Sequence, residues 1–275
     1  MSLGRFARRL ARRMLEGETP PEWERLEDGW RAPGVRARGW NVESVVATQQ
    51  AKWPEFLRLV SLPHPLPVHL WAGDLARPTP EANTVLMAYG YALTLAARMR
   101  DRLSLLDWGG GLGHYRLISQ TLLPGVDIEY HCRDLPLLCK AGRELHSSVT
   151  FHEGDETCFA RDYDFVLASG SLEYSEDWED VARRLARAAR RHFYVARLPV
   201  VHGAPSFTVV QRPYRHGYAT EYVSWVLNRQ RFLDRLGGLD MTLVREVLLG
   251  EGPDIRGAPE RCEFRSFLFV PASGH

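Results

Sequence analysis

The sequence predicts an α/β protein built on a seven-stranded, mostly parallel β-sheet whose last strand runs antiparallel. From residue 101 onward, short apolar runs alternate with helical patterns, as expected for parallel strands joined by helices on both faces of a sheet. The last two apolar runs, 241–250 and 262–270, have no helical stretch between them, so they should pair antiparallel. With 275 residues, of which 45% are hydrophobic, the chain can bury a core of this size.

Residues 1–100 are expected to form a helical and irregular extension that closes over the sheet as a lid. Within it, residues 18–40 look irregular because they are rich in Pro, Gly and Trp. Residues 41–60 read as a helix interrupted near Pro54, and residues 81–100 as a strong helix of alanines and leucines.

Residues 101–275 are expected to form the sheet domain, with an insertion at about 199–228. The pattern predicts strands at 102–108, 126–134, 149–155, 163–170, 192–200, 241–250 and 262–270. It predicts helices at 114–123, 135–145, 175–191 and 229–239. The helix at 175–191 begins with acids and ends with arginines, as the helix dipole favours.

Composition excludes several classes of protein. A net charge of +1 argues against a nucleic-acid binder that depends on bulk charge. The four cysteines form no CxxC and have no zinc-ligand spacing, which indicates reduced thiols in a cytoplasmic protein without a metal site. No apolar run reaches the roughly 18 residues that would span a bilayer.

The first 17 residues have the pattern of a basic amphipathic helix. We interpret this segment first as an ordinary amphipathic helix; weak contact with an anionic membrane surface is the alternative. Its apolar positions fall on one helical face, with arginines around them: Leu3, Phe6, Leu10 and Met14 against Arg5, Arg8, Arg9, Arg12 and Arg13.

A glycine-rich turn follows the first strand of the sheet domain, in the stretch LLDWGGGLGHY from Leu105 to Tyr115. It is not a phosphate-binding P-loop, because no Lys follows the glycines. It fails the dinucleotide fingerprint GxGxxG, because His114 or Arg116 falls where the third glycine should stand. It lacks the serine of a hydrolase nucleophile elbow.

The pattern that remains, Asp107-x-Gly109-x-Gly111-x-Gly113, resembles motif I of class I S-adenosylmethionine (SAM) dependent methyltransferases, which have a Rossmann-like fold. The chain also resembles a bacterial family of methyltransferases with unassigned substrate, in stretches such as EANTVLMAYGYALTLAA and RLPVVHGAPSFTVVQRPY. Glycines let the backbone approach a ligand closely, and a carboxylate at the strand end suits a cationic ammonium better than a phosphate. The resemblance implies that the methionine part of SAM is surrounded by Asp107, Gly109, Gly110, Gly111 and Gly113.

The same resemblance implies further cofactor contacts at the ends of the next strands. Asp134, followed by Leu135 in an Asp-Leu-Pro triplet, should bind the ribose hydroxyls, with helix capping as the alternative role. Asp155 is the candidate adenine contact. Ser169 and Gly170 should lie at the edge of the SAM pocket.

Two residues are candidates for a general base. His114 opens a helix, whose positive end should keep the imidazole neutral, although local hydrogen bonding is an alternative role. Glu173 is the second candidate, with a solvated acid as its alternative. The segment LEYSEDW resembles one that carries a catalytic histidine in plant-type O-methyltransferases, but this sequence has Glu173 and Tyr174 there.

The insertion and its surroundings interleave aromatic residues with arginines. Such a surface suits a sugar, carboxylate or phosphate-bearing acceptor, and it equally suits a homodimer interface. The candidate substrate residues are Tyr115, Tyr174, Arg197, Arg212, Tyr214, Tyr218 and Tyr222.

The sequence therefore predicts SAM-dependent methyl transfer to a small-molecule acceptor, with oxygen as the expected methylated atom. Two alternatives stay open: a non-catalytic protein of the same fold that binds SAM or a partner enzyme, and an NAD-dependent enzyme.

Overall fold

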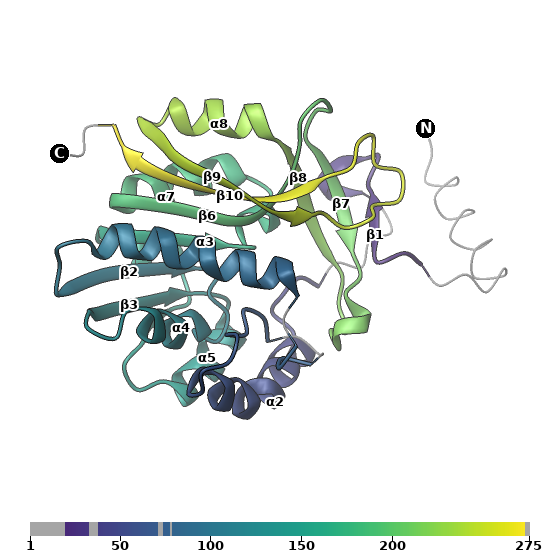
Figure 1. Cartoon of the computed structure of the whole chain (residues 1–275). Helices are drawn as coiled ribbons and strands as arrows, with labels where there is room; N and C mark the ends of the chain where they lie inside the picture. Colours follow the sequence, from purple (N-terminus) through teal and green to yellow (C-terminus); the bar gives the residue numbers. More distant parts are fainter. Residues whose placement is uncertain (1–19, 33–37, 71–73, 78, 273–275) are drawn as a thin grey trace.

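A computed structural model of the chain describes residues 20–32, 38–70, 74–77 and 79–272. Its strands form one sheet in the order β1-β7-β8-β6-β5-β2-β3-β4, with β10 pairing both β6 and β9 (Figure 1). The strands are β1 Trp23–Arg25, β2 Arg102–Trp108, β3 Asp127–Arg133, β4 Thr150–His152, β5 Tyr163–Ser169, β6 Ala189–Val201, β7 Phe207–Gln211, β8 Tyr222–Asn228, β9 Met241–Glu251 and β10 Glu263–Pro271.

Seven of these strands confirm the predicted fold class. They follow the order β4-β3-β2-β5-β6-β10-β9, and β2 pairs in parallel with both β3 and β5. β10 runs antiparallel to β6 and to β9, as the missing helix between the last two apolar runs predicted. The core is therefore a Rossmann-like sheet with a reversed last strand.

The insertion adds strands that the sequence did not predict. β7 and β8 pair as an antiparallel hairpin, and β1 from the N-terminal extension joins the outer edge of β7. Val200 of β6 pairs with Glu263 of β10 and also with Leu227 of β8, so β8 must lie on the opposite edge of β6 from β10. That is the β5 edge, just beyond the carboxyl end of β5, and the hairpin therefore stands beside the ends of the central strands.

Helices cover both faces of the sheet and create two cores. One core joins α2, α3, α4 and α5 to one face, and Figure 1 shows α3 lying across the strands there. The other core joins α7 and α8 to the opposite face. The helices are α2 Glu43–Val60, α3 Pro80–Ala97, α4 His114–Leu122, α5 Pro136–Leu145, α6 Asp155–Cys158, α7 Trp178–Ala188 and α8 Arg229–Gly237, with short 3-10 turns η1 Gly29–Arg31, η2 Leu172–Tyr174 and η3 Tyr214–His216.

Helix α3 follows directly from its sequence. Thr79 caps its first turn by accepting a hydrogen bond from the backbone N–H of Ala82, and Pro80 occupies the first helical position, where no N–H is needed. A β-carbon added to Gly90 would lie 3.6 Å from Leu122 of α4, so the small residue allows the two helices to pack closely. The first turn of α3 is thereby held over the carboxyl end of the sheet.

The structure corrects the predictions for two of the helices. α2 is not interrupted near Pro54 but runs continuously through it, because the burial of Trp53 and Phe56 outweighs the backbone hydrogen bond that proline cannot make. The helix predicted at 175–191 ends at Ala188, and β6 starts at Ala189, where the chain pairs with Tyr163 of β5.

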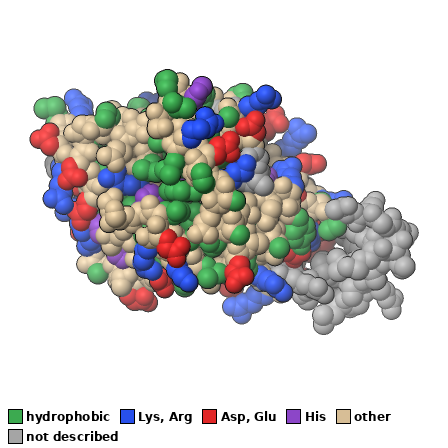
Figure 2. All heavy atoms as spheres, turned by 90° about the horizontal axis from the view of Figure 1, so that it is seen from below, with side chains coloured by type: hydrophobic (Ala, Val, Ile, Leu, Met, Phe, Trp, Pro, Cys, Tyr) green, Lys and Arg blue, Asp and Glu red, His purple; other side chains and the backbone are tan. Residues whose placement is uncertain are grey.

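The surface mixes charges of both signs. Figure 2 shows acidic and basic side chains spread around a face whose middle is occupied by hydrophobic groups. No helix in the described part of the chain is both long and apolar enough to cross a membrane. All four cysteines are buried and free. The predicted basic helix at 1–17 lies outside the described residues.

Candidate functional site

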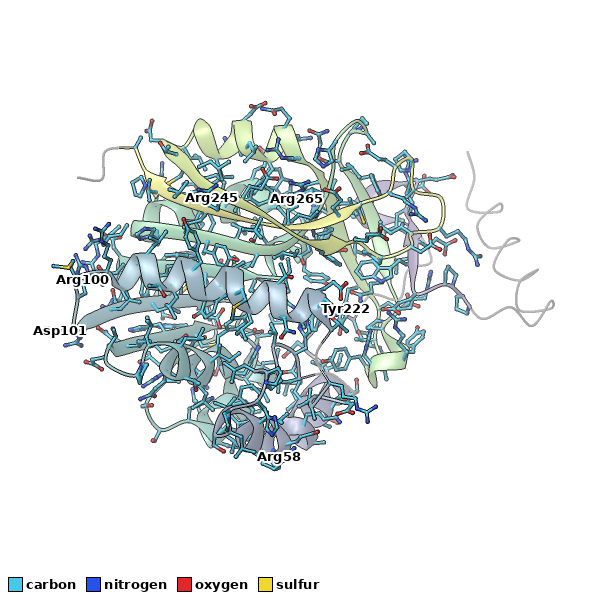
Figure 3. All side chains as sticks on the ribbon, viewed as in Figure 1. Arg58, Arg100, Asp101, Tyr222, Arg245 and Arg265 are labelled. Carbon is cyan, nitrogen blue, oxygen red and sulfur yellow. The ribbon has the colours of Figure 1, made fainter. Side chains whose placement is uncertain are left out.

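A cavity of about 810 Å³ opens at the carboxyl ends of the parallel strands. This is the edge at which open α/β sheets bind ligands, and the volume is that of a small-molecule pocket. Figure 3 places Arg100 and Asp101 at the opposite edge, where β2 begins, and Tyr222 of β8 at the cavity end. The cavity is lined by the glycine turn, the ends of β3, β5, β6 and β9, the loop before α3, and the insertion.

The glycine turn needs its glycines for backbone conformation. Gly109, Gly111 and Gly113 have φ angles of 77°, 60° and 80°, a left-handed region that other residues rarely adopt. Gly109 and Gly111 line the cavity, whereas Gly110 and Gly113 do not. The turn therefore presents bare backbone to the cavity at two of the positions that the sequence predicted.

Asp107 lies behind the turn and does not line the cavity. A β-carbon at Gly110 would meet its carboxylate, which also accepts a hydrogen bond from the Tyr130 hydroxyl on β3. Burial raises the pKa of Asp107 to about 7, although the hydrogen bond from Tyr130 opposes this shift. The structure therefore places Asp107 as a buried support for the turn.

Asp134 stands at the end of β3 and lines the cavity together with Leu135. One carboxylate oxygen accepts the backbone N–H of Gly111 at 2.6 Å, and the other accepts that of Leu135 at 2.7 Å. Burial raises the pKa of Asp134, while these hydrogen bonds act in the opposite direction. Each oxygen retains acceptor capacity for a ligand hydroxyl, since a carboxylate accepts about four hydrogen bonds.

Asp155 also lines the cavity, but its charge is already paired. Its two oxygens lie 2.6 Å from Arg133 Nε and 3.0 Å from Arg184 Nη1. Trp108 donates its indole N–H toward the same carboxylate at 3.4 Å. This end of the cavity is thus an ion-pair cluster, in which Asp155 bridges two arginines.

Arg197 brings a positive charge to the centre of the cavity. β6 carries two residues, Ala196 and Arg197, opposite the single Ser266 of β10, and Arg197 has a φ of 58° at this β-bulge. Its guanidinium donates to the Ser169 hydroxyl at 3.2 Å and to the Ser169 carbonyl at 2.7 Å. Gly170, with a φ of 61°, leaves the space that this guanidinium occupies. The bulge therefore aims a strand arginine at the end of β5.

Glu173 combines burial with an oxygen that has no partner. It lies in η2, lines the cavity and is 5% exposed, and its Oε2 has no hydrogen-bond partner among the described residues. Burial raises its pKa to about 7, while its backbone N–H and the charge of Arg197 favour the ionised form. Near neutral pH the side chain therefore exists in both protonation states, which suits proton transfer.

His114 is held as a neutral ring. Its Nε2 lies 3.1 Å from the carbonyl of Val68, so Nε2 must carry the proton, and Nδ1 is a buried acceptor without a partner in the described structure. Burial, followed by the charge of Arg197, lowers its pKa to about 3. Neutrality agrees with the prediction, but burial rather than the helix dipole is the main cause, and so low a pKa makes His114 a poor base.

His69 is a cavity residue that the sequence did not predict. Its Nδ1 lies 2.9 Å from Arg197 Nη1, and burial followed by the charge of Arg197 lowers its pKa. It comes from the proline-rich loop, whose Val68 also contacts His114. No sequence signal connects position 69 with position 197. Among the residues described, no group of three His, Cys, Asp or Glu side chains is arranged to hold a metal ion.

Aromatic residues form the wall beside Glu173. Tyr174, Tyr218 and Trp40 line the cavity, and Trp40 packs edge-on against both tyrosines. The Tyr174 hydroxyl donates to Gln211 at 3.0 Å, which joins this wall to the inserted hairpin. Of the predicted substrate residues, Tyr174, Arg197 and Tyr218 thus lie in the cavity.

The other four predicted substrate residues do not line it. Arg212 is 7% exposed, and its guanidinium lies between Glu24 and Glu221, at 3.2 and 3.4 Å. It clamps β1 to the insertion. The remaining three are engaged elsewhere: Tyr115 with Ser169 and Tyr89, Tyr214 with Glu221, and Tyr222 in a stack on Trp40.

No protein-family model and no curated protein matches the sequence. Among solved structures, the fold resembles LepI in complex with SAM, at 11% identity and a TM-score of 0.44 over 65% of this chain, which spans only 46% of the LepI chain. It also resembles the CcbJ methyltransferase from Streptomyces caelestis, at 15% identity and a TM-score of 0.46 over 74% of this chain and 94% of that one.

A third solved structure is a Burkholderia thailandensis 1,6-didemethyltoxoflavin-N1-methyltransferase with bound S-adenosylhomocysteine. It is 16% identical, with a TM-score of 0.42 over 76% of this chain and 95% of that one. At these identities and TM-scores, the likenesses say nothing about the substrate of this chain.

Proposed function

We propose that this protein binds SAM and transfers its methyl group to an oxygen atom of a small-molecule acceptor. The observation that carries the proposal is one cavity lined both by a left-handed glycine turn and by Glu173, whose Oε2 has no hydrogen-bond partner among the described residues. A site for binding alone has no need of a buried, half-ionised acid, because burying such a group costs stability. The catalytic reading is therefore favoured over a non-catalytic one.

The residues at one end of the cavity fit the chemistry of SAM. Gly109 and Gly111 leave bare backbone beside the cavity, and Asp134 offers carboxylate oxygens suited to a pair of ribose hydroxyls. Leu135 follows at the same edge and offers an apolar contact to a base. When bound, SAM supplies an electrophilic methyl group on a positively charged sulfur.

The chain's own residues then act on the acceptor. Glu173 Oε2 accepts the proton of an acceptor hydroxyl, which its pKa of about 7 permits at neutral pH. Arg197 faces the oxygen on which negative charge develops, and a fixed cation in a closed site stabilises such charge. Tyr174 and Tyr218 hold the acceptor at the distance needed for in-line transfer and keep water away.

Described residues from the first hundred positions form the roof of the cavity, which supports the division into a lid, 1–100, and a methyltransferase domain, 101–275. Val68 accepts a hydrogen bond from His114, and His69 contacts Arg197. Gln49 of α2 would lie 3.4 Å from a β-carbon on Gly111.

Four buried free thiols support a cytoplasmic location. Membrane contact through residues 1–17 and a homodimer stay predictions.

Calorimetry with SAM, S-adenosylhomocysteine and NADH tests the cofactor directly. We expect micromolar binding of the first two and none of the third, and Asp134→Ala should weaken binding. The second test is transfer of labelled methyl from SAM to a panel of phenols and other hydroxyl compounds, with Glu173→Gln as the inactive variant. Binding of NADH without SAM would overturn the proposal. Binding of SAM with no transfer to any acceptor would leave the non-catalytic alternative.

A further inference from the structure

The cavity lined by Glu173 also has an apolar part, whose side chains have no role in the proposed cofactor binding or proton transfer. Its lining side chains come from the loop before α3, the first two turns of α3, and the ends of β9 and β10. We call this region the apolar lobe: Leu75, Ala82, Val85, Leu249 and Phe264. Leu75, Val85 and Leu249 belong to one buried hydrophobic cluster, and Phe264 packs against it.

The lobe lies far from the cofactor end of the cavity. In the order β3-β2-β5-β6-β10, four strand spacings separate Asp134 from Phe264, which is roughly 19 Å. Glu173 follows β5, only two spacings or roughly 10 Å from β10. The proton acceptor thus stands between the glycine turn and the lobe.

The close approach of α3 and β9 keeps the lobe narrow. Gly250, at the end of β9, has φ 157°, and a β-carbon there would lie 2.6 Å from Glu81 Cγ. In Figure 1 the N-terminal end of α3 and the adjoining ends of β9 and β10 point the same way, toward the inserted hairpin. The lobe is therefore a slot roofed by a helix end and floored by strand ends.

We propose that the acceptor is an amphiphilic hydroxyl compound whose apolar body fills the apolar lobe while its hydroxyl reaches Glu173. This inference rests on the proposed function and names its substrate class. An apolar pocket continuous with a reactive carboxylate gains free energy from a ligand that removes both surfaces from water. A purely polar acceptor would leave the five apolar side chains of the lobe in contact with water, although Thr79, Glu81 and Glu251 also line this part of the cavity.

A series of 4-alkylphenols, from methyl to hexyl, tests this inference by calorimetry on the protein saturated with S-adenosylhomocysteine. Each added methylene should tighten binding about fourfold, the factor that corresponds to about 0.8 kcal/mol, until the lobe is full. Ala82→Leu narrows the lobe and should abolish the gain beyond the shortest chains. Asn83→Leu, on the exposed side of the same turn, should bind the series like the wild type. Leu249→Ala should move the optimum to a longer chain.

Equal affinity across the series in the wild type would overturn the inference, as would an Ala82→Leu variant that follows the wild-type slope. Binding of S-adenosylhomocysteine alone is measured first, so the two proposals fail separately. If S-adenosylhomocysteine binds but affinity does not depend on chain length, only the proposal of an amphiphilic acceptor is refuted. If affinity depends on chain length in the ligand-free protein but S-adenosylhomocysteine does not bind, only the proposed methyl transfer is refuted.

Discussion

Arg197 lies at the bulge within β6 and Gly170 directly follows the neighbouring strand β5; both have left-handed backbone conformations, and the guanidinium of Arg197 occupies the space of the side chain that Gly170 lacks. A β-carbon at position 170 would lie 2.5 Å from Arg197 Nη2. Non-glycine residues with positive φ are strained, and such strain is retained where the surroundings impose it. The arginine at the centre of the cavity therefore depends on a glycine on the adjacent strand.

Gly170→Ala should displace Arg197. The substitution adds a side chain at a φ of 61° and a clash with the guanidinium, so we expect a loss of stability of at least roughly 1–2 kcal/mol. Acceptor turnover should fall with it, because the fixed cation is lost. Thermal unfolding and methyl transfer measure the two effects. Gly125→Ala is the control, since a β-carbon there meets nothing within 4 Å; equal effects of both variants would contradict the pairing.

Methyl transfer should depend on pH through Glu173. The pKa of this carboxyl is about 7, and only the ionised form accepts a proton. We therefore expect kcat/KM to rise with pH and level off above about pH 7. In Glu173→Gln the rate should be lower by two orders of magnitude or more, and kcat/KM should no longer rise with pH in this range. A variant that retained the wild-type profile would exclude Glu173 as the base.

The contribution of Glu173 to the stability of the ligand-free protein should fall as the pH rises. Burial raises the pKa of Glu173 from 4.5 in the unfolded chain to about 7, so between these values the folded state binds its proton more tightly. Its contribution is present below pH 4.5 and is lost as the pH rises through 7. Between pH 4.5 and pH 8, the free energy of unfolding should therefore fall by up to about 3 kcal/mol more in the wild type than in Glu173→Gln.

Urea unfolding of both proteins at the two pH values measures this difference. Glu156→Gln, which changes an exposed carboxyl on α6, is the control and should follow the wild type. An equal change in unfolding free energy between the two pH values in the wild type and in Glu173→Gln would show that the carboxylate is not buried as the structure has it.

Removing the charge of Asp134 should weaken binding of the cofactor. Hydrogen bonds to a carboxylate are worth about 1.5–3 kcal/mol, so Asp134→Asn should raise the Kd of S-adenosylhomocysteine about ten- to a hundredfold. Asp127→Asn, at the exposed start of the same strand, should leave it unchanged. Calorimetry distinguishes them. Unchanged affinity in Asp134→Asn would restrict this residue to holding the Gly111 and Leu135 amides.

His114→Ala should retain turnover at saturating acceptor. A pKa of about 3 keeps His114 neutral at every pH of the assay, so the pH dependence of turnover should not include its titration. Loss of its hydrogen bond to Val68 should instead loosen the loop and raise the KM of the acceptor. A fall of a hundredfold or more in kcat, with KM unchanged, would restore His114 as a base.

Local patterns in the sequence were sufficient for the central sheet. Alternation of apolar and helical stretches predicted the parallel strands, and the missing helix between 241–250 and 262–270 predicted the reversed one. The glycine turn could also be recognised, because left-handed backbone at Gly109, Gly111 and Gly113 is a property of single residues and their neighbours.

The insertion shows where such patterns stop. Its aromatic residues and arginines suggested a binding surface. In the structure, however, Arg212 forms ion pairs and Tyr222 stacks on Trp40, and these contacts hold β1, β7 and β8 together. Which side of a residue faces a cavity depends on strand pairing across distant parts of the chain. Position in the sequence alone does not reveal it.

From its own residues the chain specified the alternating elements, the glycine turn and the acids at the strand ends, since each depends on backbone preferences over a few positions. The meeting of His69, Glu173 and Arg197 in one cavity, and the apolar lobe beyond them, came only with the folded molecule. The cause is a bulge in β6 and a hairpin beside β5, together with a loop over both, in which His69 contacts Arg197 at a sequence separation of 128 positions.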